Sequence, residues 1–226
     1  KVCGSGLKAV MLAAQAIKAG DLQLAVAGGF ESMSNVPYYL RNHRGGVKFG
    51  DQTLQDGLIY DGLWCSFGNC HMGGHAEYTA NKAGVSREAA DTFAYNSHMK
   101  AVAALESGKF SDEIVPLDVR VRENGSWRDI HFDTDEGPRA DTTVEGLSRL
   151  RPVFDPKGTV TAGNSTFLTD GSDLVLLMSR GKAAELGYEP RARVALSASG
   201  AVDLEQDLLL GPVKVVPDLL QRSGLS

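Results

Sequence analysis

The sequence predicts an α/β protein whose core consists of helices layered against a buried sheet. Residues 7–19 place apolar side chains at helical spacing, and residues 22–27 follow as a short run that is apolar except at Gln23. A strand that is apolar on both faces is expected inside a sheet that helices cover. A second such run, residues 174–178, returns to core-type sequence after a long polar stretch. This order predicts a layered α/β core interrupted by an inserted region.

The first elements are bounded by glycines. The helix over residues 7–19 is followed by Gly20, at the position where a left-handed residue commonly ends a helix. The strand over residues 22–27 is expected to end at Gly28-Gly29. Residues 30–74 show no sustained periodicity, and an irregular stretch of that length in a compact domain is usually functional.

The inserted region is expected to contain its own helix and hairpin. Residues 86–108 predict a helix with a serine as N-cap and a glycine at the end. Residues 114–121 and 128–132 alternate apolar and polar side chains across Asn124-Gly125, which is a strong signal for a hairpin turn. These strands should therefore have one face in water.

Core-type sequence resumes after the insertion. Residues 158–164 are small and turn-rich, and residues 174–178 predict a second buried strand. Three further elements are expected: a short helix at residues 180–186, a strand at residues 191–196, and the start of a helix at residues 217–222 with Pro217 near its first position.

Composition and charge exclude several classes of function. The 226 residues are 42% hydrophobic and 23% charged, which is typical of a globular protein rather than a disordered one. The net charge is −5 and basic residues form no run, so a nucleic-acid partner is not expected. No apolar run has the length of a membrane span, and no secretion signal is visible. A cytoplasmic location is expected, although a mitochondrial or peroxisomal address would lie in sequence before Lys1.

Cys3 is a candidate nucleophile because it lies just before the first turn of a predicted helix. The positive end of the helix dipole and the unpaired N–H groups there both favour a thiolate. The neighbouring Gly4 and Gly6 leave room for a substrate carbonyl, whose developing oxyanion the same N–H groups would bind. A buried cysteine that acts as a small apolar side chain is the alternative.

Cys65, Cys70, His71 and His75 form a second cluster of reactive residues. The adjacent Cys70 and His71 would have to bend back onto one ion, and the spacing of the cysteines does not match zinc-finger patterns. No metal site is therefore predicted. The two cysteines are expected to be packing residues, with one or both histidines facing a cleft.

Nucleotide-binding turns are not expected either. Gly28-Gly29 and residues 4–6 lack the full fingerprints of dinucleotide or phosphate loops, and they are expected to form tight turns. Arg139 is a candidate for pairing with a phosphate, with a solvated surface charge as the alternative.

Several motifs together resemble the thiolase family in order and spacing, and the similarity covers the whole chain. The motifs are residues 2–10 (VCGSGLKAV), 27–34 (AGGFESMS), 71–73 (HMG) and 158–164 (GTVTAGN), with Asp170-Gly171 after them. Within this family, the acetoacetyl-CoA, or biosynthetic, branch is the most similar in three segments: residues 45–48, residues 61–63 and the His71-Met72 pair.

This resemblance implies a layered αβαβα sandwich, incomplete in this chain, with an inserted α+β loop domain. Residues 1–189 would form the N-terminal domain without its start, with the loop domain inserted at about residues 30–158. Residues 190–226 would begin the C-terminal domain.

The resemblance also implies an acyl-CoA C-acyltransferase. Cys3 would be the acylated nucleophile in the Claisen condensation of two acetyl-CoA molecules to acetoacetyl-CoA and CoA, or in the reverse thiolysis. Coenzyme A would be a substrate or product, and no cofactor would be needed. The family's activating histidine and second cysteine belong to C-terminal motifs beyond Ser226, so this chain by itself is expected to be inactive. A homodimer or homotetramer is also implied.

Substrate contacts are carried over from the family by position. The residues expected to line the CoA and acyl pocket are Leu63, His71, Met72, Arg139, Phe154, Ala162, Thr166 and Leu168. Thr166 stands where the family commonly has serine, and residues 167–169 are similar to the β subunit of trifunctional thiolases. A longer-chain 3-ketoacyl-CoA thiolase is therefore one alternative. A non-catalytic thiolase-like protein that binds acyl-CoA or lipid is another.

Overall fold

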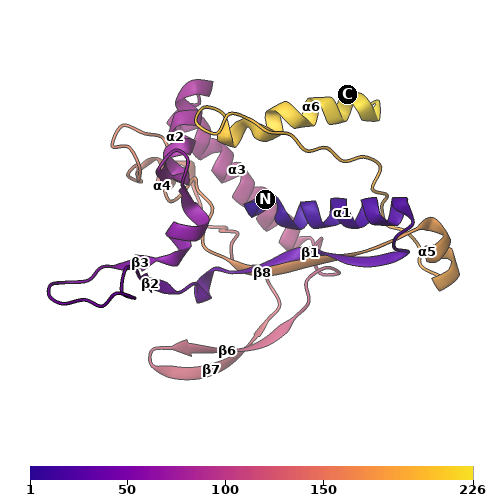
Figure 1. Ribbon diagram of the computed structural model, residues 1–226, viewed down its shortest axis with the longest axis horizontal. Helices are drawn as coiled ribbons and strands as arrows, with labels where there is room; N and C mark the ends of the chain where they lie inside the picture. Colours follow the sequence, from indigo (N-terminus) through magenta and orange to yellow (C-terminus); the bar gives the residue numbers. More distant parts are fainter. Residues whose placement is uncertain (226) are drawn as a thin grey trace. The chain divides into compact units, whose positions relative to one another are not determined.

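The computed structural model describes residues 1–225 and divides into two compact units (Figure 1). The first unit consists of residues 1–75 and the residues from Leu168 onward, and the second unit consists of residues 76–167. The second unit thus interrupts the first along the chain. No helix in residues 1–225 is long and apolar enough to span a membrane.

The first unit is built around a two-stranded antiparallel sheet. Strand β1 (Leu24–Ser32) pairs with strand β8 (Asp170–Met178) over nine residues, from Leu24 opposite Met178 to Ser32 opposite Asp170. Helix α1 (Ser5–Ala19) runs along this sheet (Figure 1). The other elements are η1 (Val2–Gly4), η2 (Met33–Asn35), β2 (Tyr38–Leu40), β3 (Leu54–Asp56), the π-helical turn η3 (Leu58–Leu63), β4 (Trp64–Cys65), β5 (Cys70–His71), the start of α2 (Met72–Ala83), α5 (Arg180–Leu186), η4 (Leu208–Leu210) and α6 (Gly211–Ser223).

Helix α1 forms as its apolar spacing predicts, and small residues let it approach the sheet. Gly20 has a φ of +88° and ends the helix in the left-handed conformation. Ala14 of α1 and Ala27 of β1 are both buried. A β-carbon on Gly29 would lie 3.3 Å from the α-carbon of Gly6, so the backbones of helix and strand are close at this point.

Strand β1 extends further than predicted. Gly28-Gly29 was expected to end it in a tight turn, but both glycines lie inside the strand, which continues to Ser32. A β-carbon on Gly28 would overlap the carbonyl oxygen of Asp173 on the paired strand. The glycine pair therefore permits close contact between backbones rather than a turn.

Two other expectations for the first unit are wrong. Residues 191–196 were expected to form a strand, but the structure of residues 1–225 has no strand there. A strand needs a neighbouring strand to satisfy its backbone groups, and none pairs with this segment among the described residues. Helix α6 begins at Gly211 rather than at Pro217, and its proline near the first position is Pro212.

The second unit contains a 20-residue helix and one hairpin. Ser86 caps α3 (Arg87–Glu106) by accepting a hydrogen bond from the Ala89 N–H. Strands β6 (Leu117–Glu123) and β7 (Ser126–Phe132) pair across the predicted turn, where Asn124 and Gly125 both have positive φ. The remainder of α2 and the short helix α4 (Val144–Ser148) complete the regular structure of this unit.

Buried polar groups hold the second unit together. Asp91 of α3 is 1% exposed and accepts hydrogen bonds from Arg87 Nε at 2.7 Å and from Asn164 Nδ2 at 2.9 Å. Arg87 Nη2 also donates to the carbonyl of Leu147 at 2.7 Å, and Asn164 Oδ1 accepts from the N–H of Thr161. These contacts join α3 to α4 and to the turn-rich residues 158–164.

Candidate functional site

Cys3 is an exposed free thiol at the start of α1. It lies in the 3₁₀ turn η1, which leads directly into the helix, and the Gly4 N–H donates to the Lys1 carbonyl at 3.0 Å to close that turn. The contact of Gly6 with Gly29 holds the first turn of α1 against β1. The local sequence thus places a reactive side chain at the end of a helix that is itself fixed to the sheet.

The N-terminus of α1 has no side-chain cap and no acidic residue in its first turn among the described residues. The Gly4 and Ser5 N–H groups donate to the Lys1 and Val2 carbonyls within η1, and no acidic side chain of the described first turn offsets the positive end of the helix dipole. Val2 has a φ of +49°, which a β-branched residue rarely adopts. Strained backbone of this kind is concentrated at functional sites. The positive end of the α1 dipole therefore favours negative charge at the exposed Cys3 sulfur.

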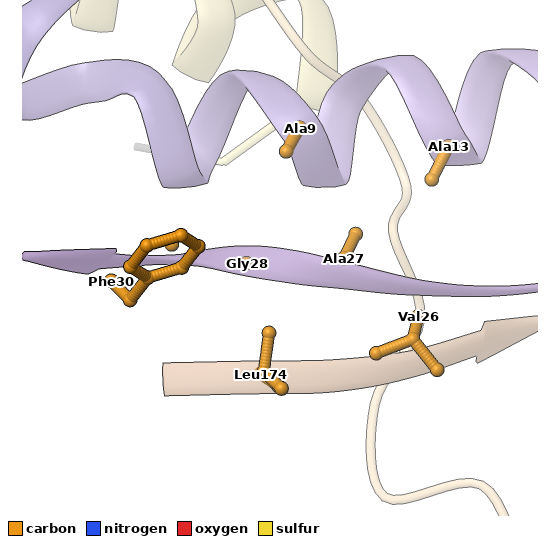
Figure 2. A pocket seen from close by; sticks show the side chains of 8 residues that line it. Ala9, Ala13, Val26, Ala27, Gly28, Phe30 and Leu174 are labelled. Carbon is orange, nitrogen blue, oxygen red and sulfur yellow. The ribbon is translucent and has the colours of Figure 1, made fainter. Parts of the chain in front are cut away.

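An apolar groove is lined by residues of α1, β1 and β8 (Figure 2). Its lining consists of small and apolar residues: Ala9, Ala13, Val26, Ala27, Gly28, Gly29, Phe30 and Leu174. Ala9 and Ala13 of α1 point toward the side of β1 that carries Ala27 (Figure 2). The lining includes no titratable side chain. The groove can therefore accept apolar atoms but supplies no acid, base or nucleophile.

The predicted pocket residues are divided between the two units. The first unit holds Cys3, Leu63, His71, Met72 and Leu168, and the second unit holds Arg139, Phe154, Ala162 and Thr166. Within the first unit, Leu63 ends η3, while His71 ends β5 and Met72 begins α2. His71 Nδ1 accepts a hydrogen bond from the Gly73 N–H at 3.0 Å, which orients its ring at the start of α2.

Arg139 has a carboxylate partner of its own. Its guanidinium lies 3.4 Å from Asp141, and both side chains are mostly exposed. The hydrogen bond from Arg139, followed by its positive charge, holds the pKa of Asp141 below the usual range. The Arg139 N–H donates to His98 Nδ1 at 3.2 Å, and the His98 ring stacks on Phe167. Arg139 thus faces solvent with its charge partly balanced, and a phosphate would compete with Asp141 for it.

The second unit's other predicted residues lie around the turn-rich segment. Ala162 and Thr166 are exposed, and both lie close in sequence to Asn164, which the Asp91 contacts hold in place. Phe154 is 39% exposed, and Leu168, at the return to the first unit, is 66% exposed. The fold therefore leaves these side chains accessible.

The cluster of cysteines and histidines does not assemble into a metal centre in the part of the chain that the structure describes. No group of three or more His, Cys, Asp or Glu side chains there is arranged to hold an ion. Cys65 is buried and Cys70 is partly buried. His75 is buried as well, whereas His71 is half-buried.

Two carboxylates with structural roles were not found from the sequence. Glu77 of α2 accepts hydrogen bonds from the N–H groups of Thr159 and Val160, both at 2.8 Å. Asp170 accepts from the Ser34 side chain, from the Ser34 N–H at 2.9 Å and from the Ser32 hydroxyl at 3.0 Å. The partners are separated by more than eighty residues in each case, so no local spacing signals them.

Known proteins with similar sequences are acyl-CoA enzymes by name. An acetyl-CoA acetyltransferase of Pseudomonas aeruginosa is 49% identical over all of this chain and 56% of its own length. A protein of the same name from Thiocystis violacea is 47% identical over 99% of this chain and 56% of its own length. The chain thus spans about half the length of the curated relatives it matches.

A solved structure shows the same fold. The acetyl-CoA acetyltransferase from Syntrophomonas wolfei superposes with a TM-score of 0.87 and 36% sequence identity, over 99% of this chain and 55% of that one. The predicted α/β, thiolase-like fold is therefore confirmed. The family model of the thiolase N-terminal domain matches residues 1–181, and the chain therefore belongs to the thiolase family.

Proposed function

We propose that the protein containing this chain is an acetyl-CoA C-acetyltransferase that uses Cys3 as its nucleophile. The observation that carries this proposal is the exposed thiol at the uncapped N-terminus of α1. The names of the relatives from Pseudomonas aeruginosa and Thiocystis violacea support acetyl-CoA as the substrate. Condensation of two acetyl-CoA molecules gives acetoacetyl-CoA and CoA, and thiolysis is the reverse.

The first half-reaction is acyl transfer to sulfur. The Cys3 thiolate attacks the thioester carbonyl of acetyl-CoA, and the carbonyl oxygen becomes an oxyanion beside the N–H groups of α1. The C–S bond to CoA then breaks, and CoA leaves as its thiolate. A carbanion from a second acetyl-CoA attacks the Cys3 thioester, forms the new carbon–carbon bond and releases the Cys3 sulfur.

Substrate positioning is proposed for the residues that match the family's pocket. The acyl and pantetheine parts of the substrate would be contacted by Leu63, Met72, Phe154, Ala162, Thr166 and Leu168. His71 would face the reacting end of the substrate. Arg139 would meet the adenine or phosphate end in exchange with Asp141. No cofactor beyond CoA as substrate and product is proposed, and the protein would act in the cytoplasm as a homodimer or homotetramer.

The same proposal assigns domains. Residues 1–189 would belong to the N-terminal domain with a loop domain inserted at about residues 30–158, and residues 190–226 would begin the C-terminal domain. The division of the chain into an interrupted first unit and an inserted second unit supports an insertion.

The test is acylation of Cys3 in the full-length protein. Incubation with acetyl-CoA should add one acetyl group to the peptide that contains Cys3, as measured by mass spectrometry. Cys3→Ser should abolish this adduct and lower turnover by several powers of ten, because a hydroxyl is a far weaker nucleophile. Cys70→Ser, a matched cysteine substitution, should retain both. Normal turnover in Cys3→Ser would refute the proposal.

A comparison of substrates separates the alternatives. Rates of thiolysis on acetoacetyl-CoA and on a long-chain 3-ketoacyl-CoA should favour the short substrate. Preference for the long substrate would assign the protein to fatty-acid β-oxidation. Tight binding of acyl-CoA with no acyl transfer would identify a non-catalytic binding protein.

A further inference from the structure

Two cysteines lie directly opposite each other in a short hairpin of the first unit. Strands β4 and β5 pair in antiparallel register, with Trp64 opposite His71 and Cys65 opposite Cys70. Opposed residues of antiparallel strands point to the same face, with β-carbons about 4.5–5.5 Å apart. A disulfide needs β-carbons about 3.5–4.5 Å apart, so about 1 Å of closure is sufficient. The register therefore brings two free thiols close to bonding geometry.

The two sulfur atoms converge on Gly68, in the turn of this hairpin. The Gly68 N–H donates a hydrogen bond to Cys65 Sγ at 3.3 Å. Cys70 Sγ lies 3.5 Å from the position that a β-carbon on Gly68 would occupy. Both sulfurs thus face the interior of the turn. Cys65 is buried, whereas Cys70 is partly exposed, so a small solute in water would meet Cys70 first.

A buried histidine borders the same space. His75 is 5% exposed, and its Nε2 has no hydrogen-bond partner among the described residues. That nitrogen lies 3.0 Å from the position of a β-carbon on Gly68, so it faces the turn that holds both sulfurs. A buried, unpartnered ring nitrogen is costly, and a role as acceptor for a neighbouring thiol would explain its retention.

We propose that Cys65 and Cys70 form a reversible disulfide when the protein meets hydrogen peroxide. The Cys70 thiol gives its proton to His75, and its sulfur attacks one peroxide oxygen. The O–O bond breaks and the departing hydroxide is protonated to water, which leaves a sulfenic acid on Cys70. Cys65 sulfur then attacks Cys70 sulfur, the S–O bond breaks, and a second water leaves with the Cys65 proton. Two thiols are oxidised and one peroxide is reduced to two waters.

The disulfide would alter the segment that enters α2. His71 follows Cys70 directly, and its Nδ1 accepts from the Gly73 N–H in the first turn of that helix. Formation of the Cys65–Cys70 disulfide moves this segment, and it therefore moves the His71 side chain, which belongs to the proposed CoA pocket. This consequence for activity rests on the proposed function, whereas formation of the disulfide does not.

The experiment is peptide mapping of the intact protein after treatment with hydrogen peroxide. Remaining thiols are blocked, and the protein is digested with chymotrypsin, which cleaves after Phe67 and so separates the two cysteines. Mass spectrometry should then find the Cys65 and Cys70 peptides joined, and dithiothreitol should release them. Blocked, unjoined thiols at both positions, or joining to Cys3 instead, would overturn the proposal. The Cys3→Ser variant should still form the disulfide, which makes the result independent of the proposed nucleophile.

Two histidine variants test whether His75 accepts the proton of the Cys70 thiol. His75→Asn should slow disulfide formation about tenfold or more, because proton removal is part of the first step. His43→Asn changes an exposed histidine of another loop and should leave the rate unchanged. Cys70→Ser should form no sulfenic acid at this hairpin. Equal rates in the two histidine variants would remove His75 from the mechanism.

Discussion

In the second unit, buried polar side chains bind distant segments to one another, whereas in the first unit the β1–β8 sheet leaves large apolar side chains exposed. Asp91 is 1% exposed and lies between Arg87 and Asn164. Val26 on β1 is 63% exposed and Leu174 on β8 is 61% exposed. Both regions have regular secondary structure, so the difference concerns what stabilises each of them.

This contrast shows where the free energy of each region originates. A two-stranded sheet is marginally stable unless a further layer covers its faces, because exposed apolar side chains gain little from folding. A paired carboxylate that is removed from water stabilises only while every partner is present. The stability of the second unit should therefore fall when a single buried polar group is lost. The stability of the first unit should fall when the backbones of β1 and β8 are pushed apart. Hydrogen exchange measured peptide by peptide reports the opening free energy of each region separately.

Asp91→Ala should have the largest effect on stability. It removes the buried acceptor of Arg87 and Asn164, which then keep only carbonyl acceptors, and loss of one partner of a buried ion pair typically costs about 3–5 kcal/mol. Hydrogen exchange in α3 and in residues 158–164 should accelerate accordingly. Asp141→Ala, which removes an exposed partner of Arg139, should leave the exchange rates nearly unchanged. Similar effects of the two substitutions would contradict the role assigned to the buried cluster.

Glu77→Gln should have the next largest effect. The amide keeps one acceptor oxygen but places an NH₂ group toward N–H donors of Thr159 and Val160, so at least one charge-assisted hydrogen bond is lost. A loss of about 1.5–3 kcal/mol is expected, measured as faster exchange of residues 158–164. Glu113→Gln changes an exposed carboxylate and serves as the control. Unchanged exchange in the Glu77 variant would show that the loop is held by other contacts.

Gly28→Ala tests the backbone fit of the first unit. The added methyl group would overlap the carbonyl of Asp173, so the strands must separate at a cost of about 1–3 kcal/mol. Gly171→Ala on β8 meets no atom within 4 Å and should be neutral or slightly stabilising. Hydrogen-exchange rates in β1 and β8 show whether Gly28→Ala destabilises the sheet while Gly171→Ala does not. A neutral Gly28→Ala variant would mean that the sheet adjusts without loss.

Asp170→Asn should have the smallest effect, and that effect should depend on pH. Hydrogen bonds from the side chain and then the N–H of Ser34 hold the pKa of Asp170 below its ordinary value of 3.8. A lowered pKa in the folded state means that the carboxylate stabilises folding above its ordinary pKa. That contribution is lost as pH falls through the lowered value. The opening free energies of β8 in the parent and the Asn variant should therefore differ at pH 6, and the difference should shrink as pH falls below the ordinary pKa of 3.8. A difference that grows in acid would contradict this assignment.

The local elements of both units could be predicted from the sequence because their signals are short-range. Helix α1 with its glycine end, α3 with its Ser86 cap and the hairpin at Asn124-Gly125 depend on neighbours within a few residues. The α5 helix is likewise capped by Ser179 and ended by Gly187, at φ +74°. The same reasoning singled out Cys3 at the start of a helix, where the structure places it.

The errors occur where contacts between distant segments decide the outcome. Strand β1 passes through Gly28-Gly29 because β8, far along the chain, pairs with it as far as Ser32. Residues 191–196 have strand-like composition but pair with no strand among the described residues. The hydrogen bonds that Asp170 accepts from Ser32 and Ser34 likewise join segments more than 130 residues apart, so no local pattern indicates them.

The sequence by itself determined the α/β class, the family and the position of the candidate nucleophile, since periodicity, caps and motifs are written in neighbouring residues. The tertiary structure alone decided which carboxylates are buried with partners and that Cys65 lies opposite Cys70. It also decided that His75 faces their turn. These facts depend on strand register and on the packing of segments far apart in the chain, where burial and hydrogen bonding, rather than local propensity, set the free energy.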